Sequence, residues 1–102
     1  MPEQFIPNWT DAVRSMYSEQ PRMQRDEAIR TATFAASTLM FAAQAFGLTS
    51  GAMVGFDADG VKEAFGLGAD EVPVVLLAVG RSAPGNWPQK LRRPVSEVLE
   101  LA

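Results

Sequence analysis

Hydrophobic and polar positions near the N-terminus follow the spacing of a short amphipathic helix. Apolar side chains recur three and four residues apart at Trp9, Val13, Met16 and Tyr17. We expect this helix to begin at Asn8 or Thr10, either of which can cap it, and to reach about Ser18. The pair Gln20-Pro21 ends it, because proline cannot continue a helix and restricts the residue before it.

A longer helix is predicted from about Arg22 to Phe46, where Gly47 supplies the left-handed residue that ends many helices. One apolar face is formed by Ile29, Ala32, Ala36, Leu39, Met40, Ala43 and Phe46, and a second by Phe34, Phe41 and Ala45. The C-terminal half is therefore apolar almost all round, which is typical of a buried helix. Phe34 and Phe41 are expected to be core residues.

The pattern then changes to glycine-rich and β-branched sequence. Residues 48–56 hold two glycines, Gly51 and Gly55, and are interpreted as a loop, and Asp57 can cap a helix that runs to Phe65 and is closed by Gly66. The continuous apolar run Val72–Val79 predicts a central strand buried on both faces, in which Pro73 is tolerated only near the start. A loop at 81–89 follows, and residues 96–102 form a last helical turn or an extension.

These elements need partners that the chain does not contain. A buried strand requires hydrogen-bonded neighbours at both edges, and the chain offers one convincing strand. The long helix requires apolar contacts on every side. We therefore expect an α+β fold whose sheet is completed elsewhere, the chain being a protomer interleaved with a twin or a fragment of a longer protein.

The composition argues against several classes of function. The 102 residues are 47% apolar and 21% charged, as in a small globular domain, and the net charge of −3 argues against nucleic-acid binding. Neither histidine nor cysteine is present, which excludes a Ser-His-Asp triad and thiolate chemistry. No catalytic side chain and no metal site is predicted. A bound cofactor is expected to supply any chemistry.

One stretch, from Thr31 to Phe56, carries no charged residue. Polar residues and glycines interrupt it, however, and its longest apolar run is Leu39–Ala43, whereas a membrane helix needs about 20 predominantly apolar residues. The N-terminus also lacks the pattern of a secretory signal. We expect a cytoplasmic protein that neither spans a membrane nor binds nucleic acid.

An ordered set of short motifs connects these elements. An apolar helix ends in Gly-Leu, a loop closes on Gly-Phe-Asp, a short helix again ends in Gly-Leu, and a buried strand ends in glycine, all between Gly47 and Gly80. The sequence KLRRP follows at Lys90–Pro94. This set resembles the C-terminal half of the nitroreductase family. The resemblance covers about residues 25–95, between a helical lead-in at 1–24 and an extension at 96–102, all within a single partial domain.

The resemblance implies a fold, cofactors and partners. Nitroreductases are intertwined α+β homodimers that use flavin mononucleotide (FMN) to pass electrons from NADH or NADPH to nitroaromatics, quinones or similar small acceptors. Family chains are about twice as long, and the half not matched here carries an Arg-Ser-x-Arg type motif that grips the flavin phosphate. Residues 1–24 contain nothing like that motif. A complementary N-terminal half is therefore a second expected partner.

The resemblance also implies a flavin site. The backbone of Met53, Val54 and Gly55 would run along the flavin ring, with the amides of Val54 and Gly55 pointing at N5 and O4. Many family members carry an acidic residue at the position of Val54, but this contact requires only the backbone. Fixed hydrogen-bond donors at that edge of the ring tune the redox potential and the geometry of the flavin. Glycine permits close approach of the backbone to the ring. The structural alternative is a simple helix-to-helix turn shaped by glycines.

A second part of the site is expected at Lys90 and Arg92. Two residues apart in an extended segment, they point to the same side while Arg93 points to the other. The resemblance places them at the phosphate or ribityl end of the flavin, where arginine can bind in a forked, bidentate way. A solvated basic loop is the alternative. The leading hypothesis is a flavin-dependent oxidoreductase or a piece of one, and the alternative is a dimerising or scaffolding module of the same fold without flavin.

Overall fold

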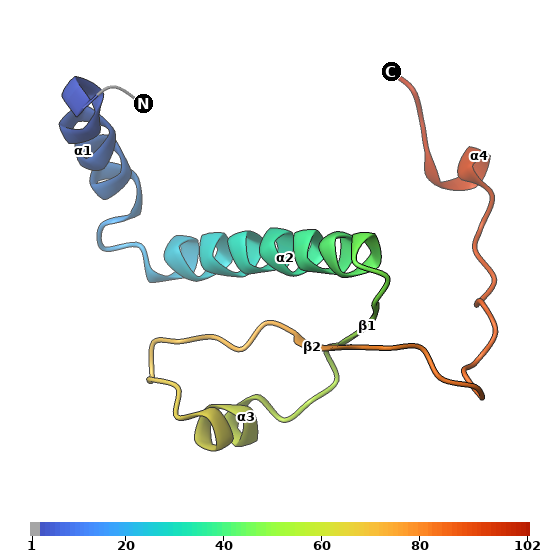
Figure 1. Ribbon diagram of the computed structural model, residues 1–102. Coiled ribbons are helices and arrows are strands. Elements are labelled where there is room, and N and C mark those ends of the chain that lie inside the picture. Colours follow the sequence, from blue (N-terminus) through green and yellow to red (C-terminus); the bar gives the residue numbers. More distant parts are fainter. Residues whose placement is uncertain (1–2) are drawn as a thin grey trace.

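Two helices form the N-terminal part of the molecule (Figure 1). The computed structural model describes residues 3–102, in which a 3-10 turn at Glu3–Phe5 leads directly into α1 (Ile6–Tyr17), followed by α2 (Pro21–Ala45). The prediction that the first helix begins at Asn8 or Thr10 is wrong. The helix begins earlier because Pro7 is accommodated in its first turn, where a backbone N–H has no acceptor in any case. The long helix agrees with prediction to within one residue at each end.

Both Gly-Leu pairs end helices in the same way. Gly47 has φ +73° and Gly66 has φ +64°, the left-handed region that glycine enters without steric cost. In each case the following leucine donates its N–H back over five residues, Leu48 to the Ala43 carbonyl and Leu67 to the Lys62 carbonyl, both at 2.9 Å. These bonds satisfy carbonyls that the helix end would otherwise leave unpaired. The predicted ends of both helices are confirmed.

The sheet differs from the prediction in both of its strands. β1 (Thr49–Met53) pairs antiparallel with β2 (Leu76–Gly80), Thr49 lying opposite Gly80 and Met53 opposite Leu76. The prediction of a loop over residues 48–56 is therefore wrong for β1. Its small residues have weak strand preference, and it forms a strand because the apolar run of β2 supplies a partner. β2 begins four residues later than predicted, because β1 pairs with only five residues.

Two short helices complete the described elements. α3 (Ala58–Phe65) is capped by Asp57, whose Oδ1 accepts the N–H of Asp59 at 3.2 Å. The predicted cap and the predicted helix are confirmed. α4 (Val95–Val98) follows Pro94 and is shorter than the predicted turn over 96–102. Between β2 and α4 the chain forms an arm, residues 81–94, without helix or strand (Figure 1).

The elements do not enclose a core. α2 packs on both strands, yet among the residues whose side chains the structure describes only Ala43 is buried, at 5% exposure. The radius of gyration is 18.7 Å, whereas a compact domain of this length has about 13 Å. Phe34 and Phe41, predicted to be core residues, are 68% and 77% exposed. That prediction is wrong for the chain alone, because the described residues leave this side of α2 uncovered.

Candidate functional site

The turn between β1 and α3 contains the first predicted site residues. Met53 is the last residue of β1, and Val54 and Gly55 follow it outside any helix or strand. The pairing of Met53 with Leu76 holds one end of this turn, and the cap of α3 at Asp57 holds the other. The turn is thus a short segment fixed at both ends, a suitable support for backbone groups that must keep a defined position.

Backbone donors are available at this turn. Among the described residues, the N–H groups of Val54 and Gly55 donate to no other backbone group. The Val54 side chain is 75% exposed, and a Cβ added at Gly55 would meet no atom within 4 Å. Two unpaired donors beside open space fit the backbone contact with an FMN ring that the resemblance implies. The donor set at the turn therefore suits the predicted cofactor.

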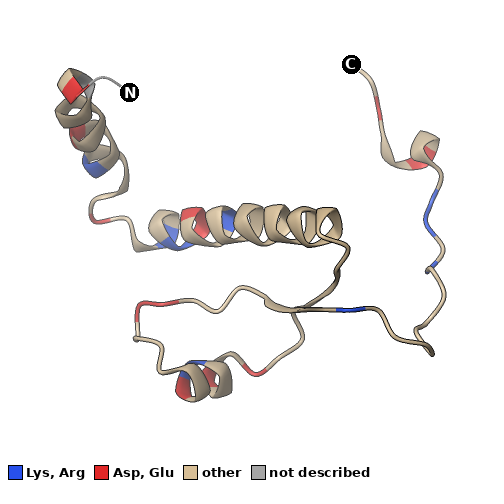
Figure 2. Ribbon diagram, in the orientation of Figure 1, with Lys and Arg blue, Asp and Glu red and all other residues tan. Residues whose placement is uncertain are grey.

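The second pair of predicted residues lies on the arm. Lys90 and Arg92 are exposed, and neither side chain forms a hydrogen bond or an ion pair with another described residue. Figure 2 shows basic residues along the arm, and Figure 1 shows the arm diverging from the turn between β1 and α3. The chain thus brings Met53, Val54 and Gly55 together, and Lys90 and Arg92 together, but it does not bring the two groups into contact with each other.

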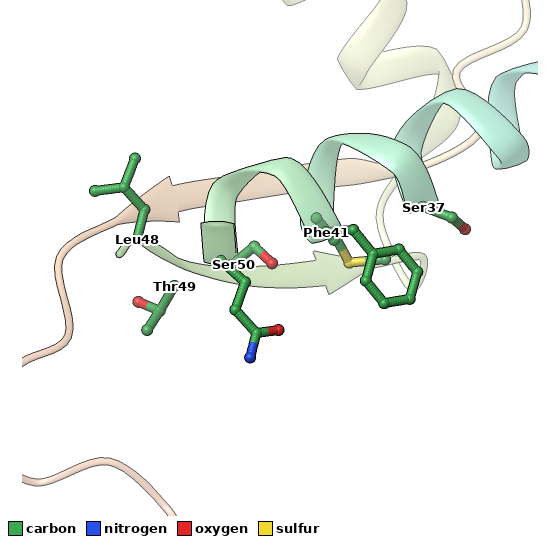
Figure 3. A pocket seen from close by; sticks show the side chains of 7 residues that line it. Ser37, Phe41, Leu48, Thr49 and Ser50 are labelled. Carbon is green, nitrogen blue, oxygen red and sulfur yellow. The ribbon is translucent and has the colours of Figure 1, made fainter. Parts of the chain in front are cut away.

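A hollow beside the start of β1 was not predicted from the sequence. It has a volume of about 560 Å³ and is bordered by Ser37, Met40, Phe41 and Gln44 of α2 and by residues 48–50 (Figure 3). The four helix residues are related by spacings of three and four along one side of α2, so their shared face was available as a sequence signal. The hollow itself exists only because β1 packs against α2, and the sequence did not predict that strand. Hydroxyl and amide groups thus share one concave surface with the apolar side chains of Met40, Phe41 and Leu48.

The segments around the hollow carry no charged side chains. The C-terminal half of α2 and both strands carry no charged side chain, whereas the N-terminal half of α2 is charged and includes the ion pair between Arg30 and Glu27 (Figure 2). Within residues 3–102 no group of three acidic residues is arranged to hold a metal ion. None of the helices in that range has both the length and the apolarity needed to cross a bilayer.

Comparison with curated proteins identifies relatives by sequence. The profile of the nitroreductase family matches residues 3–81. Protein DrgA of Synechocystis is 42% identical over 78 residues, which cover 74% of this chain and 37% of DrgA. MhqN of Bacillus subtilis, named as an NAD(P)H nitroreductase, is 31% identical over 91 residues, or 88% of this chain and 44% of that protein. The chain spans less than half the length of these two relatives.

Solved structures agree with the sequence comparison. A Bacillus subtilis protein described as the nitroreductase ydfN superposes on 100% of this chain and 50% of its own, with a TM-score of 0.84 and 30% identity. A protein from Exiguobacterium sibiricum, described as a nitroreductase in complex with FMN, covers 100% of this chain and 49% of its own, with a TM-score of 0.84 and 27% identity. The fold is thus nitroreductase-like in every described element. The chain belongs to the nitroreductase family.

Proposed function

We propose that this chain is the C-terminal, flavin-contacting half of an FMN-dependent oxidoreductase of the nitroreductase type. Electrons would come from NADH or NADPH and leave to a nitroaromatic, a quinone or a similar small acceptor. The observation that carries the proposal is the superposition of the whole chain on a nitroreductase structure that contains FMN. The name of MhqN supports the nicotinamide donor.

The turn at Met53–Gly55 contacts the flavin ring. Bound FMN would supply the hydride chemistry, which fits a chain that contains neither histidine nor cysteine. The unpaired N–H groups of Val54 and Gly55 donate to the ring edge, and the missing side chain of Gly55 lets the backbone approach. Because both ends of the turn are held, the donors are in place before the cofactor arrives.

The arm, residues 81–94, binds the phosphate of FMN. Lys90 and Arg92 have no other partner among the described residues, and a phosphate dianion is the group that a neighbouring lysine and arginine bind best. The ring and the phosphate of FMN are joined by an extended ribityl chain. The residues that contact the ring and those that contact the phosphate must therefore lie apart from each other, as the turn and the arm do. The assembled protein acts in the cytoplasm as a homodimer.

A fluorescence titration tests this assignment. Adding the purified chain to FMN, with and without the half of the fold that it lacks, should quench flavin emission until one flavin is bound per chain. The double variant Lys90→Ala/Arg92→Ala should weaken binding at least tenfold, because it removes two charge-assisted contacts. Arg93→Ala is the matched control and should bind like the original chain. Absence of quenching at micromolar protein in both conditions would instead support a module of this fold without flavin.

A further inference from the structure

A second hollow lies between the sheet and the first half of the arm. It has a volume of about 510 Å³ and is bordered by residues 49–51 of β1, by residues 78–80 of β2, and by Asn86 and Trp87 of the arm. A volume of this size is within the range of small-molecule sites. The Trp87 side chain is 93% exposed, so the indole forms an open wall of this hollow and packs against little else in the described chain.

The arm is folded so that Trp87 returns to the sheet. Gly85 lies in a turn with φ +92°, and Asn86 Nδ2 donates to Ser82 Oγ at 3.1 Å. These two features close a loop that begins directly after β2, and Trp87 therefore borders the same hollow as Gly80. The Oδ1 atom of Asn86 accepts no hydrogen bond from another described residue. An amide oxygen beside the indole is thus free to accept one from a ligand.

The arm is the basic part of an acidic chain. It carries four of the nine lysine and arginine residues and no carboxylate, although the chain has a net charge of −3 (Figure 2). Lys90 and Arg92 are assigned to the phosphate of FMN, which leaves Arg81 and Arg93 without a role. Arg81 directly follows Gly80 at the border of the hollow, is exposed, and forms no ion pair with another described residue.

These groups together suit a nucleotide. A nucleobase stacks on an exposed indole, a free amide oxygen accepts a hydrogen bond from a base amino group, and a guanidinium binds a phosphate through charge-assisted hydrogen bonds. The base and the phosphate of a nucleotide are held on opposite sides of a ribose, so they can reach separate residues at the border of one hollow. Trp87 and Arg81, six positions apart in the closed loop, offer such a pair of contacts.

β1 connects this hollow with the flavin turn. The hollow is bordered by the start of the strand at Thr49, and the turn follows its last residue, Met53. A strand of this length spans about 14 Å at the rise of an antiparallel strand. The electron donor of the proposed function is a dinucleotide, in which two riboses and a pyrophosphate separate the nicotinamide from the adenine. A donor with its nicotinamide at the turn therefore has the length to place its adenine at the other end of β1.

We propose that the second hollow binds the adenine nucleotide end of the nicotinamide dinucleotide donor. The adenine ring stacks on Trp87, its amino group donates to Asn86 Oδ1, and Arg81 binds a phosphate. The inference rests on the proposed function, because a flavin at the turn is what gives the nicotinamide end its place. NADH and NADPH share this adenine end, and NADPH carries an additional phosphate on its ribose.

Single-tryptophan chains test where the nucleotide binds. The chain has two tryptophans, so Trp9→Phe leaves Trp87 as the only indole and Trp87→Phe leaves Trp9. Adding 5′-AMP should quench the emission of the Trp9→Phe chain saturably and should leave that of the Trp87→Phe chain unchanged. Quenching in the Trp87→Phe chain alone, or no saturable quenching in either chain at millimolar 5′-AMP, would overturn the proposal.

Variants measured by ligand-observed NMR test the two contacts separately. Arg81→Ala should weaken the binding of 5′-AMP at least fivefold and that of adenosine less than twofold, because only the phosphate contact is lost. Arg25→Ala removes an exposed arginine of α2 and is the matched control, with an expected change below twofold. Loss of 5′-AMP binding in Lys90→Ala/Arg92→Ala but not in Arg81→Ala would place the nucleotide at the FMN phosphate residues and overturn the proposal.

Other nucleotides complete the test. 5′-UMP should bind at least fivefold more weakly than 5′-AMP, because it has no base amino group to donate to Asn86; equal affinities would overturn the recognition of adenine. Tighter binding of 2′,5′-ADP than of 5′-AMP would support the site as one for NADPH, and equal binding would support it as one for NADH. Binding of 5′-AMP beside Trp87 without quenching of FMN would support this site and contradict the proposed function. Quenching of FMN without any binding of 5′-AMP would do the reverse.

Discussion

Gly55→Ala separates the cofactor contact from the fold at a single position. In this chain the added methyl group would meet no atom within 4 Å, and φ of Gly55 lies outside the left-handed region. The backbone can therefore accept alanine, and we expect a change in stability within about 0.5 kcal/mol. If the turn contacts FMN, the same methyl group lies between the backbone and the ring and holds them apart.

The expected loss follows from the number of donors. Val54 and Gly55 each offer one unpaired N–H, and a hydrogen bond of this kind contributes about 0.5–1.5 kcal/mol. Weakening both contacts costs about 1–2 kcal/mol, and 1.4 kcal/mol corresponds to about a tenfold change in Kd. Val54→Ala is the matched control, because it removes an exposed side chain and keeps both N–H groups. It should change Kd less than twofold.

The assay is the quenching of FMN fluorescence, with circular dichroism and hydrogen exchange to monitor the fold. Equal affinity of Gly55→Ala and the original chain would refute the contact between the turn and the ring. Loss of β1–β2 protection in Gly55→Ala would refute the claim that this position has free space. Loss of affinity in Val54→Ala as large as in Gly55→Ala would show that side chains, and not backbone donors, make the contact.

Three further predictions concern local structure and are measured by hydrogen exchange. Asp57→Ala should destabilise α3 by about 1 kcal/mol because the Asp59 N–H loses its acceptor, while Asp57→Asn should keep most of the stability; equal protection in both variants would contradict the cap. Gly66→Ala should destabilise the end of α3 by about 1 kcal/mol through its φ of +64°, whereas Gly80→Ala, which has free space and an ordinary φ, should change little. Thr49→Val removes the Oγ1 donor to the Gly80 carbonyl and should weaken protection at that end of the β1–β2 ladder by less than about 1 kcal/mol. FMN affinity should not change. A larger loss of protection would mean that this exposed bond holds the strand register.

The helices were predictable because their signals are local. The carboxylate of Asp57, the left-handed glycines at 47 and 66, and the proline at 21 act on residues within one turn of themselves. The predicted start of α1 is wrong for the same local reason, since Pro7 suits a first helical turn as well as it suits a linker. The order of the motifs carried the family resemblance, which in turn implied the candidate site residues, and the family assignment is confirmed. The roles of the site residues stay predictions.

The strands were not predictable in the same way. β1 consists of small and polar residues whose own preferences indicate a loop, and only its pairing with an apolar run more than twenty residues away makes it a strand. The same pairing determined where β2 begins and placed Thr49 and Ser50 beside Phe41 to form the hollow. By itself, the sequence determined the helices, their ends and the lack of enough partners for a closed core. Tertiary structure decided which segments became strands and which apolar side chains stayed uncovered, because strand pairing and burial depend on contacts between residues far apart in the chain.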